Sequence, residues 1–128
     1  MFYFKTRIKP LALISAFILF VACTEKKGLP DTLEAGWQGE AVCEELLDNA
    51  EMRVLKCTFP PGVGHEKHYH QRYFGYALAG GTFRITDTTG TRDVELPTGS
   101  SFYNEGLAWH EVLNIGDSTA IYLIVEPK

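Results

Sequence analysis

Short runs of β-branched and aromatic residues alternate with turn signals along most of this chain. The turns are rich in Gly, Pro, Asn and Asp. The runs are EMRVLKCTF, YFGYALA, TFRIT, RDVEL, SSFY, HEVLN and TAIYLIVEP. No stretch holds a long apolar period of 3.6 residues, and we interpret the nearest candidate, AVCEELLDN, as a strand of a hairpin. Many short strands at regular spacing predict an all-β sandwich or closed barrel.

The N-terminus has a different pattern, that of a signal peptide (residues 1–22). Lys5, Arg7 and Lys9 are followed by the charge-free run LALISAFILFVA. This run is a dozen residues long, whereas a membrane-spanning helix needs roughly 20. FVAC is similar to a bacterial lipobox, which implies a lipidated Cys23 and a membrane anchor. Release after ordinary cleavage and an uncleaved anchor are the alternatives.

These features predict a protein of the bacterial cell envelope, periplasmic or otherwise extracytoplasmic. Residues 23–36 comprise Cys23 and a polar stretch with one proline and two glycines, which suits a tether. We expect the folded domain to comprise residues 37–128. No internal repeat or low-complexity segment divides it.

Charge excludes one class of partner. The 128 residues carry 12 Lys and Arg against 16 Asp and Glu. Residues 1–22 hold three of the basic residues and no acidic one, so the remainder has 9 against 16, a balance of −7. Nucleic-acid binding depends on clustered cations, so we expect none.

Two cysteines flank a predicted hairpin. A three-residue turn at residues 49–51 would place Cys43 and Cys57 opposite each other on antiparallel strands. Disulfides persist in exported proteins, and closing a loop of about 15 residues contributes roughly 3 kcal/mol in the chain-entropy model. The alternative is two buried thiols, because a register shift of one residue would separate them.

Three of the four histidines lie within six positions, in GHEKHYH. Residues i and i+2 of a strand share a face, so His68 and His70 can direct two imidazoles to one point. A metal needs this pairing, and neutral imidazole suits iron, zinc, copper and nickel. His110 is available as a third ligand. His65 has the wrong parity, and we expect it at the rim.

These residues also carry a family resemblance. The stretch from Gly62 through His68 and His70 to Gly81 resembles the first motif of the cupin superfamily. Gly99, His110 and Asn114 resemble the second motif, with an insert before the histidine. The resemblance covers about residues 40–127. It implies a double-stranded β-helix, or jelly roll, with a metal in the barrel mouth.

The departures from these motifs define the expected ligands. The first motif has a glutamate where this chain has Phe74 or Gly75, and Glu105 stands near the proline of the second. The predicted site is therefore His68, His70 and His110 without a carboxylate. It is similar to the three-histidine cupins, which include thiol and diketone dioxygenases. Three protein ligands leave open positions, as catalytic metals require.

Further residues are candidates by strand parity. Phe74 and Tyr76 share the parity of the two histidines, so we expect them to line the cavity; plain core packing is the alternative. Tyr103 is a candidate catalytic hydroxyl or a core tyrosine. Arg72 is a candidate clamp for a substrate carboxylate or an exposed turn residue. No nucleophile elbow, Cys-x-x-Cys pair or phosphate-binding glycine motif is present.

Two functions follow from this reading. The first is a metal-dependent enzyme with Fe(II), Mn(II), Ni(II) or Zn(II), acting on a small oxygen-rich or thiol substrate. Oxygenase, isomerase and lyase chemistry all fit it. The second is a non-catalytic envelope lipoprotein that binds a small ligand or metal, or uses the barrel as a scaffold. Assembly into a homodimer is a third possibility that the resemblance implies, and the apolar run TAIYLIVEP suits a buried sheet or a subunit interface.

Overall fold

The computed structural model describes residues 28–128, which form eleven strands and no helix. A four-stranded antiparallel sheet has the order β5 (Gly64–His70), β10 (Leu107–Asn114), β7 (Gly81–Asp87), β8 (Gly90–Leu96). A five-stranded antiparallel sheet has the order β3 (Cys43–Asp48), β4 (Met52–Phe59), β11 (Ala120–Pro127), β6 (Tyr73–Ala79), β9 (Ser101–Asn104). A two-stranded ribbon of β1 (Gly36–Trp37) and β2 (Glu40–Ala41) precedes them.

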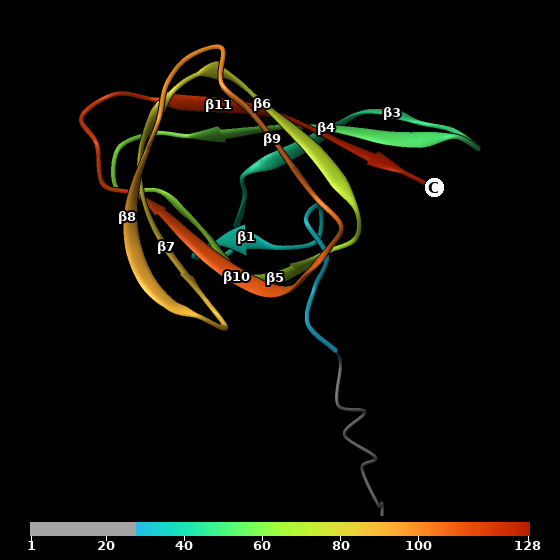
Figure 1. Ribbon diagram of the computed structural model, residues 1–128, viewed down its shortest axis with the longest axis horizontal. Helices are drawn as coiled ribbons and strands as arrows, with labels where there is room; N and C mark the ends of the chain where they lie inside the picture. The colour runs from blue at the N-terminus through green and yellow to red at the C-terminus, as the bar shows by residue number, and fades with distance from the viewer. Residues whose placement is uncertain (1–27) are drawn as a thin grey trace, which may run out of the picture.

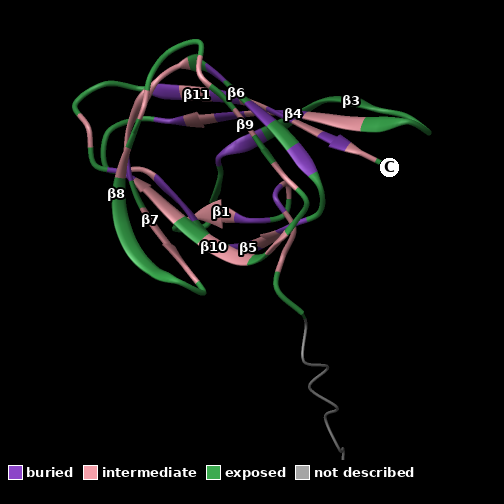
Figure 2. Ribbon diagram, viewed as in Figure 1, coloured by how far each residue is buried: buried purple, intermediate pink, exposed green. Residues whose placement is uncertain are grey.

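The two larger sheets face each other around one interior (Figure 1). Buried and less buried residues alternate in β4, β6 and β11, and in β11 they do so along the whole strand. Figure 2 shows the edge strands β3 and β8 mostly exposed, whereas β11 and β4 carry buried positions. The prediction of an all-β jelly roll is therefore confirmed.

Aromatic rings fill the space between the sheets. Phe59 packs edge-on against Phe83 with ring centroids 5.5 Å apart, and Phe83 packs edge-on against Tyr122 at 5.6 Å. All three residues are at most 5% exposed. Burying an aromatic side chain removes about 150–250 Å² from water, which is worth about 4–6 kcal/mol before entropic costs. These rings connect the two sheets.

Three motif residues support turns rather than the interior. Gly62 and Gly99 have φ of 77° and 83°, in the left-handed region that favours glycine. Asn114 is fully buried, and its Nδ2 donates to the carbonyl oxygens of Phe59 (2.8 Å) and Ser118 (2.9 Å). Its side chain therefore ties the end of β10 to the end of β4.

The structure joins Cys43 and Cys57 in a disulfide. The two residues lie directly opposite each other on β3 and β4, and residues 49–51 connect the strands. An additional residue on β3 between Glu45 and Leu47 shifts the register nearer the turn, leaving the cysteine pair in place. The bridge closes the hairpin at its far end.

The segment before β1 packs against the barrel. Thr32 and Ala35 are 1% and 3% exposed, and the Tyr69 amide donates to the Pro30 carbonyl oxygen at 3.1 Å. The expected domain start at Trp37 is therefore too late, because this segment buries side chains and pairs backbone groups with β5. Its polar composition gave no sign of that packing.

The signal peptide and the lipidation of Cys23 are predictions that concern residues 1–27, outside the part of the chain that the structure describes. The remainder of the expected tether begins at Gly28. Within residues 28–128 there is no helix of the length and apolarity that crossing a membrane requires.

Candidate metal site

A bulge between β5 and β10 sets the direction of the predicted ligands. His68 lies opposite His110, and His70 lies opposite Leu107. His68 and His70 are two positions apart on β5, whereas Leu107 and His110 are three positions apart on β10. β10 therefore carries one extra residue here. Both Leu107 and His110 consequently line the interior, where a regular strand would have sent them to opposite faces.

The structure brings His68, His70 and His110 together. Their Nε2 atoms form a triangle in which each pair is 3.0 Å apart. Among residues 28–128 these three form a cluster that could hold a metal ion. Among the described residues, this cluster includes no carboxylate. Gly75, near which the first motif has glutamate, carries no side chain, and Phe74 is exposed.

Hydrogen bonds define the tautomers of two of these rings. His68 Nδ1 lies 2.6 Å from the carbonyl oxygen of Glu66, which can only accept, so Nδ1 carries the proton. The Thr32 hydroxyl donates to Glu126 Oε1 at 3.0 Å and therefore accepts from His70 Nδ1, 2.9 Å away. Both Nε2 atoms are left with a lone pair directed into the triangle.

This arrangement fits a cation better than a hydrogen-bonded cluster. The Nε2 lone pairs of His68 and His70 face each other at 3.0 Å, and neither atom has a proton to donate. One face of an octahedron has edges of this length when the metal–nitrogen distance is about 2.1 Å, an ordinary value for imidazole. The donor set and its spacing therefore suit a transition metal held on three nitrogens.

Burial keeps the imidazoles in their neutral form. Burial, reinforced by neighbouring histidines, lowers the pKa of His70 to about 2 and that of His110 to about 3. It also lowers the pKa of His68. Neutral imidazole is the form that binds metal, so these rings are ready to act as ligands near neutral pH.

The histidines line a cavity of about 210 Å³ between the two sheets. Its walls are mostly apolar, with Tyr73 stacked on His70 at 4.3 Å between ring centroids. The Tyr122 hydroxyl is buried without a hydrogen-bond partner among the described residues. The polar lining residues besides histidine and tyrosine are Thr32, Asp87, Arg92 and Asn104.

The predicted aromatic lining is wrong. Phe74 and Tyr76 are 41% and 38% exposed on the outer face of β6. The parity of β5 does not continue into β6, because residues 71 and 72 turn the chain into the other sheet. Tyr73 therefore takes the inward position. The polar pair Gln-Arg between the two strands was the sequence signal for this change.

Tyr103 also lies away from the cavity. It is 55% exposed, and its hydroxyl donates to Glu105 Oε1 at 2.8 Å. Phe102 faces inward instead, since its ring occupies the space left by Gly75, where a Cβ would come within 2.2 Å of it. Arg72 is exposed and is not part of the cavity lining.

His65 is buried rather than at the rim. His65 and His68 are three positions apart on β5, whereas their partners Val112 and His110 are two positions apart on β10. β5 therefore has an extra residue of its own. This bulge turns His65 inward, to 3% exposure, with its ring centroid 3.8 Å from that of His68. Its Nε2 lies 3.2 Å from the Ala35 carbonyl oxygen, and His65 is outside the ligand cluster.

Known proteins share this fold and sequence pattern. The β-alanine degradation protein BauB of Pseudomonas aeruginosa is 29% identical over 91 residues, covering 70% of this chain and 95% of that protein. A cupin domain from Bordetella pertussis matches with a TM-score of 0.65 and 23% identity, covering 78% of this chain and 96% of that one. The polyketide cyclase RemF from Streptomyces resistomycificus matches with a TM-score of 0.57 and 18% identity, covering 72% of this chain and 67% of that one. The family model for the cupin domain matches residues 55–126, more than half of the chain, which therefore belongs to the cupin superfamily.

Proposed function

We propose that this protein is a small-molecule metalloenzyme that binds one divalent transition metal through His68, His70 and His110. The observation that carries the proposal is the triangle of Nε2 atoms at 3.0 Å, with the Nδ1 protons of His68 and His70 held by other groups. Three protein ligands leave coordination positions for water and substrate, which distinguishes catalytic from structural metals.

The bound metal would supply Lewis-acid or redox chemistry, and the surrounding residues would bind and orient the substrate. Cavity walls such as Phe102 and Leu107 exclude water and accept an apolar part of the substrate. Burial raises the pKa of Tyr122 to about 12, so its hydroxyl keeps its proton and can donate to a substrate oxygen. An unpaired buried hydroxyl costs about 1–3 kcal/mol, which such a hydrogen bond would offset.

The volume of the cavity limits the substrate to a small molecule. About 210 Å³ admits a compact organic acid, thiol or diketone, and excludes a polymer. The curated relative named for β-alanine degradation supports a small metabolite as the substrate class. The reaction would be an oxygenation, an isomerisation or a lyase step.

We also propose that the protein works in the cell envelope. The basic start, apolar run and FVAC of residues 1–23 support export and lipidation at Cys23. The disulfide between Cys43 and Cys57 supports an oxidising compartment, because such bonds are rare in the cytosol.

Binding without catalysis is the second candidate. It is favoured by the missing carboxylate, since Gly75 takes the inward position near which the first cupin motif has glutamate. Under this reading the protein would hold a metal or metal-bound ligand and release it unchanged.

Metal content tests the shared part of both proposals. The protein is purified from the native envelope without a histidine tag, and its metals are measured by elemental analysis for wild type, His110→Ala and His65→Gln. We expect about one transition metal per chain in wild type and in the His65 variant, and none in His110→Ala. A folded wild type that contains no metal and takes up none on reconstitution contradicts metal binding. Turnover of small acids, thiols and diketones by the loaded protein then separates catalysis from binding.

A further inference from the structure

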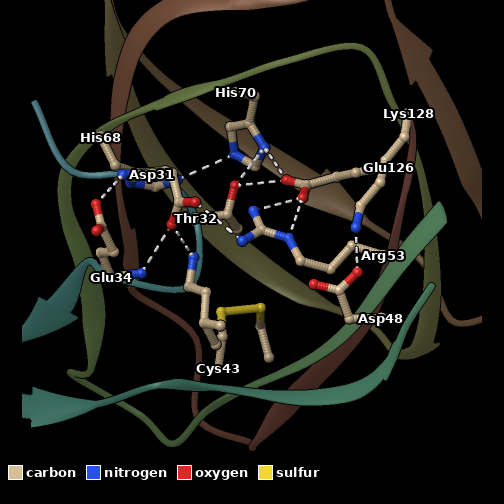
Figure 3. Close-up of polar contacts among 12 residues, drawn as sticks. Asp31, Thr32, Glu34, Cys43, Asp48, Arg53, His68, His70, Glu126 and Lys128 are labelled. Carbon is tan, nitrogen blue, oxygen red and sulfur yellow. Dashed lines mark hydrogen bonds and ion pairs between the residues drawn. A yellow bond between two sulfur atoms is a disulfide. The ribbon is translucent and has the colours of Figure 1, made fainter. Parts of the chain in front are cut away.

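A chain of buried polar groups connects His70 to the segment before the barrel (Figure 3). Thr32 Oγ1 lies 2.9 Å from His70 Nδ1 and 3.0 Å from Glu126 Oε1. Arg53 donates from Nε to Glu126 Oε2 at 2.7 Å and from Nη1 to Asp31 Oδ2 at 2.9 Å. Segments from both ends of the described chain thus meet at one ring nitrogen of a predicted metal ligand.

The donors and acceptors of this chain have one consistent direction. Arg53 is always a donor, so the Glu126 carboxylate accepts from it. The Thr32 hydroxyl has one proton and gives it to that carboxylate, which leaves its oxygen to accept from His70 Nδ1. The proton of the neutral His70 ring is consequently on Nδ1, and its Nε2 is free to bind a metal.

Burial makes this arrangement costly to break. Thr32, His70 and Glu126 are 1%, 6% and 7% exposed. Without its threonine partner, the His70 Nδ1–H would be buried without an acceptor, at a cost of about 1–3 kcal/mol. A shift of the proton to Nε2 would relieve part of that cost and would block the ligand atom.

We propose that Thr32, held by Glu126, is a positioning residue that fixes the tautomer and orientation of His70 for metal binding. The inference rests on the metal binding proposed above. It makes residues 31–32, ahead of the barrel strands, part of the metal site. Partners that fix the second nitrogen of a ligating histidine typically change metal affinity by 10–100-fold.

A purely structural clasp is the alternative role for these residues. Arg53, Asp31 and Glu126 also attach the N-terminal segment to β4 and β11, which alone would stabilise the fold. A clasp predicts that loss of the Thr32 hydroxyl lowers the melting temperature and leaves both the tautomer of His70 and the affinity for metal unchanged.

The first test uses the metal-free protein with residues 23–128. Long-range proton–nitrogen correlation spectra distinguish Nδ1–H from Nε2–H imidazole, and a His70→Gln spectrum assigns the signals. We expect Nδ1–H for His70 in wild type and in Thr32→Ser, and a mixture of tautomers in Thr32→Val. Thr58→Val, an unrelated threonine on β4, is the matched control. An unchanged tautomer in Thr32→Val overturns the inference.

The second test measures Zn²⁺ affinity by competition with a chelator for the same variants. We expect Thr32→Val to lose 10–100-fold, and Thr32→Ser and Thr58→Val to stay within about threefold of wild type. If Thr32→Val lowers the melting temperature but binds Zn²⁺ like wild type, Thr32 only attaches the N-terminal segment, and the inference fails. If wild type itself binds no Zn²⁺ or other transition metal, the proposed function fails, and the tautomer test alone decides the role of Thr32.

Discussion

Mild acid should destabilise the metal-free protein, because its buried histidines are neutral when folded and bind protons when unfolded. Burial is the largest cause of the lowered pKa values, which are about 3 for His65, about 2 for His70 and about 3 for His110. The ordinary histidine pKa is 6.5. The stability linked to these groups is therefore fully present above pH 6.5 and is lost as the pH falls toward the folded values.

The magnitude follows from the pH interval. One pH unit below 6.5, protonation stabilises an unfolded histidine by about 1.4 kcal/mol, which the folded ring cannot share. His65, His70 and His110 together give a loss of about 4 kcal/mol between pH of about 7.5 and about 5.5, a large part of the 5–15 kcal/mol of a typical domain. His68, whose pKa burial also lowers, adds to this loss. The pKa of Asp31 lies below 3.8, because hydrogen bonds from backbone amides and Arg53 outweigh its burial. Asp31 therefore contributes nothing in this interval.

Urea unfolding of the metal-free protein at the two pH values measures this loss, with the disulfide intact. His110→Ala should reduce the pH-dependent loss by about one quarter to one third, because one of the four proton-binding histidines disappears from the unfolded chain. Equal unfolding free energies at the two pH values, within about 1 kcal/mol, would refute the reasoning. The histidines would then be accessible to protons in the folded state.

Two further predictions concern the fold around the site. Replacing Cys43 and Cys57 together by Ser should cost about 3 kcal/mol in urea unfolding, since the chain between them is no longer closed; an unchanged midpoint would contradict a stabilising bridge. Gly75→Ala should cost about 1–3 kcal/mol, because its Cβ would lie 2.2 Å from the Phe102 ring. Gly28→Ala, which has open space around it, is the control, and equal stability of the two variants would show that the ring moves freely.

Local sequence spacing was enough to predict the ligand pair. His68 and His70 are two positions apart on a strand, and the motifs pointed to His110 as their partner. The structure brings their Nε2 atoms to 3.0 Å. The opposition of Cys43 and Cys57 was also predictable, since a short turn determines the register of the hairpin near it.

Side-chain direction was not predictable where a strand is interrupted. The alternation of strand faces, continued from His70 across the turn, predicted that Phe74 and Tyr76 point inward, but both lie on the outer face. The same alternation predicted that His65 lies at the rim. The bulge between His65 and His68 adds one residue to β5 and so turns His65 inward. The polar pair Gln-Arg is the only sequence signal for the turn, and no glycine or proline between His65 and His68 marks the bulge.

The sequence by itself determined the all-β class, the hairpin with its cysteine pair and the three histidines, because each depends on periodicity or on short spacing that local geometry obeys. Only the tertiary structure decided what surrounds those histidines. Thr32 and Glu126, from opposite ends of the described residues, meet beside His70, and Tyr73 stacks on its ring from the other sheet. Such contacts depend on how two sheets pack and where a terminal segment docks. The burial of side chains across the whole domain determines this packing and docking, and no local sequence pattern predicts them.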